Sequence, residues 1–153
     1  LILTADQLNG GRPSEFIPDV AWLEDYELGF APLDDDHKNM VKLVNQTAGA
    51  LNAGDMHQAF TLITRFIEAS RYHFEHEERI LRESQYPDID HHVRYHEMLL
   101  ATADDVAHQC ETVKQFDFVR ESFLVLVGCL LDDVIKGDAE FASHLVEAGL
   151  VDP

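Results

Sequence analysis

His73-Phe74-Glu75-His76-Glu77-Glu78 is the stretch that decides both the fold and the chemistry of this chain. It lies in a segment with the apolar spacing of a helix, where residues four positions apart share one face. The imidazole of His73 and the carboxylate of Glu77 can therefore reach one point in space. A single pair of this kind is weak evidence, because exposed helices are rich in Glu and His. The pattern recurs at His92-Val-Arg-Tyr-His96, which predicts a scaffold that brings both segments to one site.

Apolar residues at helical spacing extend over most of the chain. A first helix is expected to start at Asp34-Asp35-Asp36, because acidic residues favour a helix N-terminus, and to end at Asn52-Ala53-Gly54-Asp55. A second spans about 56–84, a third runs from Asp88 or Asp90 to about 109, a fourth starts near 116, and 139–150 continues as helix. The run 123–131 could also be a buried strand, but its helical neighbours favour a helix. Short connections predict an all-α, up-down-up-down four-helix bundle.

The length and composition predict a single globular domain. The chain has 153 residues, of which 46% are hydrophobic, and this is enough for a core. Residues 1–20 contain Gly10-Gly11, Pro13 and Pro18, which interrupt any periodicity. We therefore expect an irregular N-terminal arm over 1–20 and the bundle over 21–150, with the arm packed across it.

Charge and cysteine content exclude several classes of partner. The formal net charge is -18, which argues against nucleic acid and against anionic membrane surfaces. Cys110 and Cys129 lack metal-site spacing and predict neither a disulfide framework nor a thiolate zinc site. The sequence contains no apolar run of about 18 residues, the length that a helix needs to span a bilayer. A cytoplasmic location is the expectation. The chain opens without Met, so we also expect a domain excised from a longer protein.

Every predicted helix carries candidate metal ligands. The set is His37 on the first helix, His73 and Glu77 on the second, His92 and His96 on the third, and Asp133 and Asp138 near the end of the chain. Imidazole suits iron, copper, zinc and nickel, while carboxylates suit hard cations and can bridge two of them. Groups of this kind from four helices predict a dinuclear site in the bundle core. Burying so many polar groups without a metal would be very costly.

The same residues resemble the hemerythrin-like family, of the bacterial hemerythrin kind. The matching segments are Trp22, Gly29 to Lys38, His73-Phe74-x-x-Glu77-Glu78, Tyr86-Pro87, His92-x-x-x-His96 and Asp138-x-x-Phe141. The resemblance covers about 22–145, nearly the whole domain.

This resemblance implies a non-haem site of two iron ions with a bridging oxygen atom, oxo or hydroxo. Glu77 and Asp138 would be the bridging carboxylates. His37 and His73 would hold the iron with an open position for O2. His92 and His96 would hold the other iron, which in the family also receives a third His from the last helix. Substitution by manganese or zinc stays open.

The chain departs from the family pattern at three positions. The third His is expected five residues before the bridging Asp, where this chain has Asp133. The simplest expectation is that Asp133 binds the iron directly as a carboxylate; the alternative is that its shorter side chain leaves that position to water. The family usually has Trp where Cys129 stands and Tyr where Ala69 stands. Both changes remove bulk, which predicts a larger or wetter pocket unless a neighbouring aromatic residue fills it.

Three functions follow from this site. The first is an O2-binding or redox-sensing module, whose partner is O2 or another small diatomic or anionic ligand. Fusion to a signalling domain in the full-length protein stays open. The second is an oxidase or peroxidase-type enzyme, because an anionic ligand at 133 favours ferric iron and fast autoxidation. The third is a simple iron store. We expect the first, and the sequence does not decide whether the chain is an enzyme.

Overall fold

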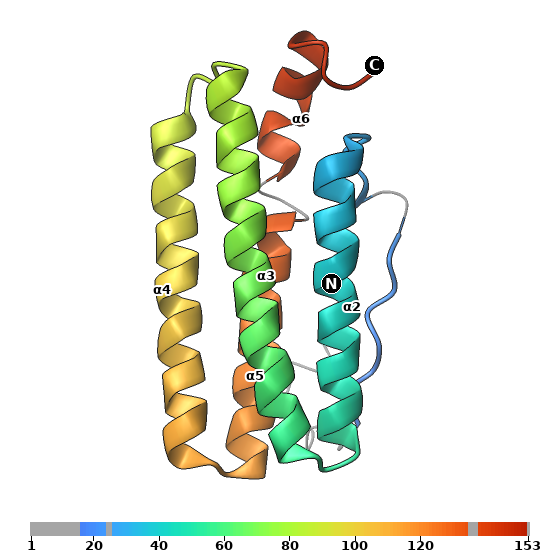
Figure 1. Ribbon diagram of the computed structural model, residues 1–153, viewed down its shortest axis with the longest axis vertical. Helices are drawn as coiled ribbons and strands as arrows, with labels where there is room; N and C mark the ends of the chain where they lie inside the picture. The colour runs from blue at the N-terminus through green and yellow to red at the C-terminus, as the bar shows by residue number, and fades with distance from the viewer. Residues whose placement is uncertain (1–15, 24–25, 135–137, 153) are drawn as a thin grey trace, which may run out of the picture.

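The computed structural model describes residues 16–23, 26–134 and 138–152, without the side chains of 132 and 138–140. All regular structure in these residues is helical, in five elements: α2 (Ala31–Asn52), α3 (Met56–Glu83), α4 (Ile89–Val113), α5 (Phe116–Asp132) and α6 (Asp138–Glu147). The four long helices α2 to α5 stand side by side and alternate in direction, and α6 lies at one end (Figure 1). The predicted all-α four-helix bundle is confirmed.

Helix α2 begins at Ala31, three residues before the predicted start at Asp34. The turn is made by Gly29, at φ 75°, followed by Phe30 in an extended conformation. Pro32 then lies in the first turn, where its fixed φ suits a helix and its missing N–H costs no bond. Asp34 lies inside the helix and uses its Oδ1 to accept a hydrogen bond of 2.8 Å from the backbone N–H of Leu28. Asp34 therefore closes the preceding turn, and the prediction placed the start of α2 three residues too late.

Two apolar clusters fill the bundle, and a polar band separates them. The larger cluster is built around side chains such as Met40, Phe66 and Phe123. The smaller one lies where α6 packs and contains Leu33, Ile80, Leu81, Phe141 and Leu145. His37 on α2 and Glu77 on α3 fall between residues of the two clusters, and His92 on α4 lies between Ile89, beside the smaller cluster, and Leu99 of the larger one. The site is therefore enclosed by apolar packing on both sides along the bundle axis.

The arm over the described residues 16–23 is irregular and runs along α2 (Figure 1). Two asparagines of α2 hold its backbone. Asn45 accepts from the N–H of Val20 at 2.7 Å and donates to its carbonyl at 2.9 Å. Asn52 does the same for Ile17, at 2.8 Å each way. The rest of the predicted arm, 1–15, lies outside the described residues.

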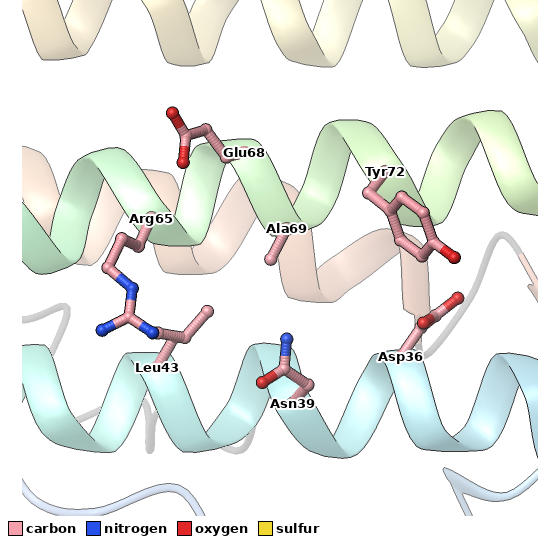
Figure 2. Close-up of a pocket in the computed structure, with 7 residues that line it drawn as sticks. All are labelled: Asp36, Asn39, Leu43, Arg65, Glu68, Ala69 and Tyr72. Atoms are coloured by element: carbon pink, nitrogen blue, oxygen red, sulfur yellow. The ribbon is translucent and has the colours of Figure 1, made fainter.

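Two further observations concern the apolarity of the helices and a pocket at the surface. Among the described helices, none combines the length and apolarity needed to cross a membrane. A pocket opens between α2 and α3, lined by residues of both helices (Figure 2).

Candidate metal centre

Three helices each place predicted ligands in the bundle interior. His37 of α2, and His73 and Glu77 of α3, are each 0% exposed. His92 and His96 of α4 are 6% and 1% exposed. The i,i+4 spacing within α3 and within α4 turns each pair toward the same interior. Such burial of polar side chains is costly unless they are hydrogen-bonded or bind a cation.

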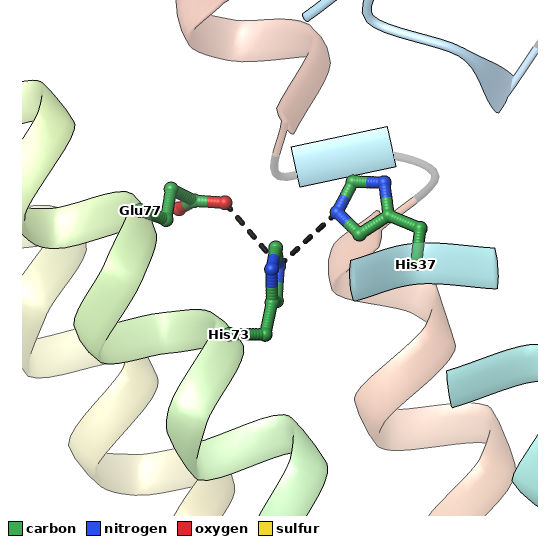
Figure 3. Close-up of side chains that lie close together, drawn as sticks. All are labelled: His37, His73 and Glu77. Carbon is green, nitrogen blue, oxygen red and sulfur yellow. Dashed lines mark hydrogen bonds and ion pairs between the residues drawn. The ribbon is translucent and has the colours of Figure 1, made fainter. Parts of the chain in front are cut away.

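The first cluster joins α2 to α3. His37 Nε2 lies 3.1 Å from His73 Nε2, and His73 Nε2 lies 3.4 Å from Glu77 Oε2. Figure 3 shows the His37 ring and the Glu77 carboxylate approaching His73 from opposite sides. One ligand atom from each residue lies within 4.8 Å of the others, a spacing that could hold a metal ion.

The second cluster joins α3 to α4 and uses Glu77 again. Glu77 Oε1 contacts His92 Nε2 and lies 3.5 Å from His96 Nε2. These three residues also form a group whose ligand atoms lie within 4.8 Å of one another. Glu77 therefore turns one oxygen toward each cluster, the arrangement that a bridging carboxylate needs.

Asp133 extends the second cluster from α5. It is 0% exposed, and its Oδ2 lies 3.4 Å from His96 Nε2. Neither of its carboxylate oxygens accepts a hydrogen bond from the described part of the chain. Its backbone forms a π-helical turn with Val134, a local widening that often marks functional sites. Asp133 thus lies where the sequence placed it, beside His96, with its oxygens aimed into the cluster.

The structure brings six of the seven predicted residues together. The seventh, Asp138, is the first residue of α6, but its side chain lies outside the described residues. The role of all seven as ligands stays a prediction.

A carboxylate outside the clusters fixes the outer nitrogen of His96. Glu78 Oε1 lies 3.0 Å from His96 Nδ1, and its Oε2 accepts from Arg82 at 3.2 Å. A carboxylate at Nδ1 keeps the proton there and leaves Nε2 able to accept or coordinate.

Asp36 is a residue that the sequence interpretation used only as a helix start signal. Its Oδ2 lies 2.7 Å from His76 Nδ1 and 3.9 Å from His73 Nδ1. Burial raises the pKa of the Asp36 carboxyl, but the imidazoles of His73 and His76 outweigh this effect, so the pKa is below its usual value. The side chain of His76 is 16% exposed, so this ion pair is partly shielded from solvent. The sequence signal for these contacts is the position of Asp36, an acidic residue directly before His37.

Aromatic rings surround the imidazoles. Phe74 stacks on His96 with centroids 4.0 Å apart and planes 8° apart. Trp22 of the arm lies 6.3 Å from the His37 ring. These contacts limit the rotation of the imidazoles and exclude water from the clusters.

The profile of the hemerythrin HHE cation-binding domain matches residues 28–136, well over half of the chain. The chain belongs to the hemerythrin family. This confirms the resemblance inferred from the sequence motifs. No curated protein sequence matches the chain.

The donor set of this hemerythrin domain fits a bound metal cation. Imidazole nitrogens and carboxylate oxygens in one buried cluster are ligands for first-row metals, and the Asp133 oxygens lack a hydrogen-bond donor among the described residues. The family description, cation binding, agrees with this geometry. Ala69 and Cys129, where the family usually has bulky aromatic residues, are both partly buried and packed against the larger apolar cluster.

Proposed function

We propose that this hemerythrin domain holds two iron ions and uses them to bind or sense O2. The observation that carries the proposal is the position of Glu77 between two histidine clusters, with one oxygen turned to each. Two clusters that share one carboxylate favour a pair of metal ions over a single ion. Two iron ions held there would supply reversible binding of O2 or its reduction.

The proposed ligands divide between the two positions. His37 and His73 would hold one ion, and His92 and His96 the other, with Glu77 shared. Asp133 would complete the second position, which its 3.4 Å distance from His96 Nε2 supports. Asp138 would be the second bridge, on the family resemblance alone. One position would then have fewer protein ligands than the other, which leaves room there for a small molecule.

The chain itself does three things for such a site. Glu78 orients the His96 imidazole from outside through its Nδ1 atom, and Asp36 places a carboxylate 3.9 Å from His73 Nδ1. Phe74 and the two apolar clusters keep bulk water away from the ligands. The carboxylates offset the charge of the cations, so that the buried site approaches neutrality.

One observation favours a second function, reduction or activation of O2 by an oxidase or peroxidase-type enzyme. Asp133 is an anionic group beside His96, in a position where the family has a neutral imidazole. Added negative charge stabilises ferric over ferrous iron, and a carrier that must release O2 unchanged avoids this. Sensing tolerates it, because a single oxidation event can be the signal.

The test mixes anaerobically reduced, iron-loaded protein with O2 and follows the absorption spectrum. A spectrally distinct oxygenated form that reverts under vacuum supports O2 binding or sensing. Immediate conversion to ferric protein, with steady O2 consumption when a reductant is present, supports the enzyme. Protein that binds iron but does not react with O2 contradicts both and leaves iron storage.

A further inference from the structure

The pocket between α2 and α3 is a feature that the proposed metal site does not use. It has a volume of about 280 Å³ and is lined by Asp36, Asn39, Leu43, Arg65, Glu68, Ala69 and Tyr72. Drug-sized sites measure roughly 300–1,000 Å³, so a molecule of amino-acid size fits here. Ala69 lies in the middle of the pocket, between Arg65 and Tyr72 (Figure 2). Its small side chain leaves the pocket open.

The two ends of the pocket carry opposite charges. Arg65 extends from α3 toward α2 at one end, while the Asp36 carboxylate and the Tyr72 hydroxyl face each other at the other end (Figure 2). Arg65 and Tyr72 are seven residues apart on α3, which corresponds to about 10.5 Å along the axis. The pocket is therefore elongated and polarised along its length.

The polar groups in this pocket are available to a ligand. Within the described part of the chain, Arg65 and Asn39 form no side-chain hydrogen bond or ion pair. Asp36 uses Oδ2 for His76, and its Oδ1 makes no hydrogen bond to a described residue. Between the charged ends, Leu43 and Ala69 supply apolar surface.

We propose that this pocket binds a small ω-amino carboxylate, a class that includes L-lysine. The carboxylate would pair with Arg65, since a guanidinium matches a carboxylate with two parallel hydrogen bonds. The ammonium group would bind Asp36 Oδ1 and the Tyr72 hydroxyl. The methylene chain would lie over Leu43 and Ala69. Glu68 at the rim makes the pocket net negative, which favours a ligand with an additional positive charge, such as L-lysine.

This ligand site would adjoin the metal centre without being part of it. Asp36 lies in the pocket wall and also 3.9 Å from His73 Nδ1. A molecule on Asp36 is therefore one side chain away from a proposed iron ligand. The proposal itself needs neither iron nor O2, so its failure is distinguishable from failure of the proposed function.

The test is isothermal titration calorimetry of the purified full chain at about 0.15 M salt, where long-range surface charge is screened. The probes are 6-aminohexanoate and L-lysine. Hexanoate and pentylamine each lack one charged group and serve as matched controls. We expect 6-aminohexanoate and L-lysine to bind with a Kd of about 1 mM or tighter. Each control compound should bind at least about tenfold more weakly, because one charged pair is lost.

Two substitutions and their controls locate the binding. Arg65→Ala should weaken 6-aminohexanoate binding by about tenfold or more, and Ala69→Phe should abolish it by filling the pocket. Arg94→Ala and Ala101→Phe make the same changes at exposed positions of α4 and should leave the Kd unchanged. Circular dichroism checks that each variant folds, and the surface change at Arg65 remains informative if Ala69→Phe does not fold. No heat with either probe, equal binding of hexanoate, or unchanged binding in Ala69→Phe or Arg65→Ala overturns the proposal.

Discussion

Asp133→Asn should stabilise the metal-free protein and weaken its binding of iron. The side chain is 0% exposed, and neither oxygen accepts a hydrogen bond from the described residues. Asp133 and Glu77 both lie near one nitrogen, His96 Nε2, at 3.4 and 3.5 Å. A ring nitrogen offers at most one N–H, which cannot serve two carboxylates well. Without a cation, the charge of Asp133 is therefore a burden on the folded state.

The expected size follows from this burial. A buried polar group that lacks a partner costs about 1–3 kcal/mol, and Asn has the same shape without the charge. In a chain of this length each kcal/mol moves Tm by about 2–4 °C. The metal-free variant should melt about 2–12 °C above the metal-free parent. The variant should bind iron at least about 10- to 100-fold more weakly than the parent. Mutation of residues that only hydrogen-bond to a metal ligand already has an effect of this size.

The assay is thermal unfolding followed by circular dichroism, with and without iron, together with an iron-binding titration. Asp105→Asn, an exposed acid on α4, is the matched control and should change neither quantity. A lower Tm of the metal-free Asp133→Asn protein would mean that the Asp133 carboxylate stabilises the folded state without a cation. Unchanged iron affinity would place Asp133 outside the metal site. Either result would refute the reasoning.

Four further predictions have defined outcomes. Asp133→His restores the imidazole expected from the family and should slow conversion of the reduced iron protein to the ferric state, measured by absorption after mixing with O2; an unchanged rate counts against direct ligation. Glu77→Gln removes the negative charge of the shared carboxylate and should lower the iron content per chain, measured by metal analysis, while Glu75→Gln on the exposed face of α3 should not. Burial raises the pKa of the Cys110 thiol, against a smaller lowering by Ser122, and the side chain is 0% exposed. Its alkylation at pH 8 should therefore be slower than that of the partly exposed Cys129, and equal rates by mass spectrometry would contradict the burial. Asn45→Ala removes two hydrogen bonds to Val20 and should lower the free energy of unfolding by about 1–3 kcal/mol, with faster proteolysis of the arm; an unchanged cleavage rate would show that the arm is held by other contacts.

The fold was accessible from sequence because each long helix shows regular apolar spacing. Asp55 caps α3 by accepting from the N–H of Gln58, as its position after Gly54 predicts. The start of α2 was predicted three residues late, because an acidic run at a helix N-terminus usually caps, and here Asp34 instead binds the backbone of Leu28. Helix α4 runs to Val113, beyond the predicted end near 109, and stops at Lys114 in a left-handed conformation that no local signal announced.

The interior position of the ligands was also predictable, because His73 and Glu77 share a helical face, as do His92 and His96. What the pattern could not give was the partner of each outer nitrogen. The contact between His76 and Asp36 joins two helices, 40 residues apart in sequence, and depends on how α2 and α3 rotate against each other. From the sequence, the pocket beside Ala69 could be anticipated only because Ala has a much smaller side chain than the Tyr that the family usually has there. Its charged ends come from residues on two helices that no single-helix period relates.

Metal analysis of the purified chain, loaded with iron under anaerobic conditions and freed of excess metal, tests the central claim most directly. A dinuclear centre built on Glu77 predicts about two iron ions per chain, with both positions losing occupancy in Glu77→Gln. One iron per chain, or a content that Glu77→Gln leaves unchanged, would contradict the shared carboxylate. A chain that retains no iron would contradict the site as a whole.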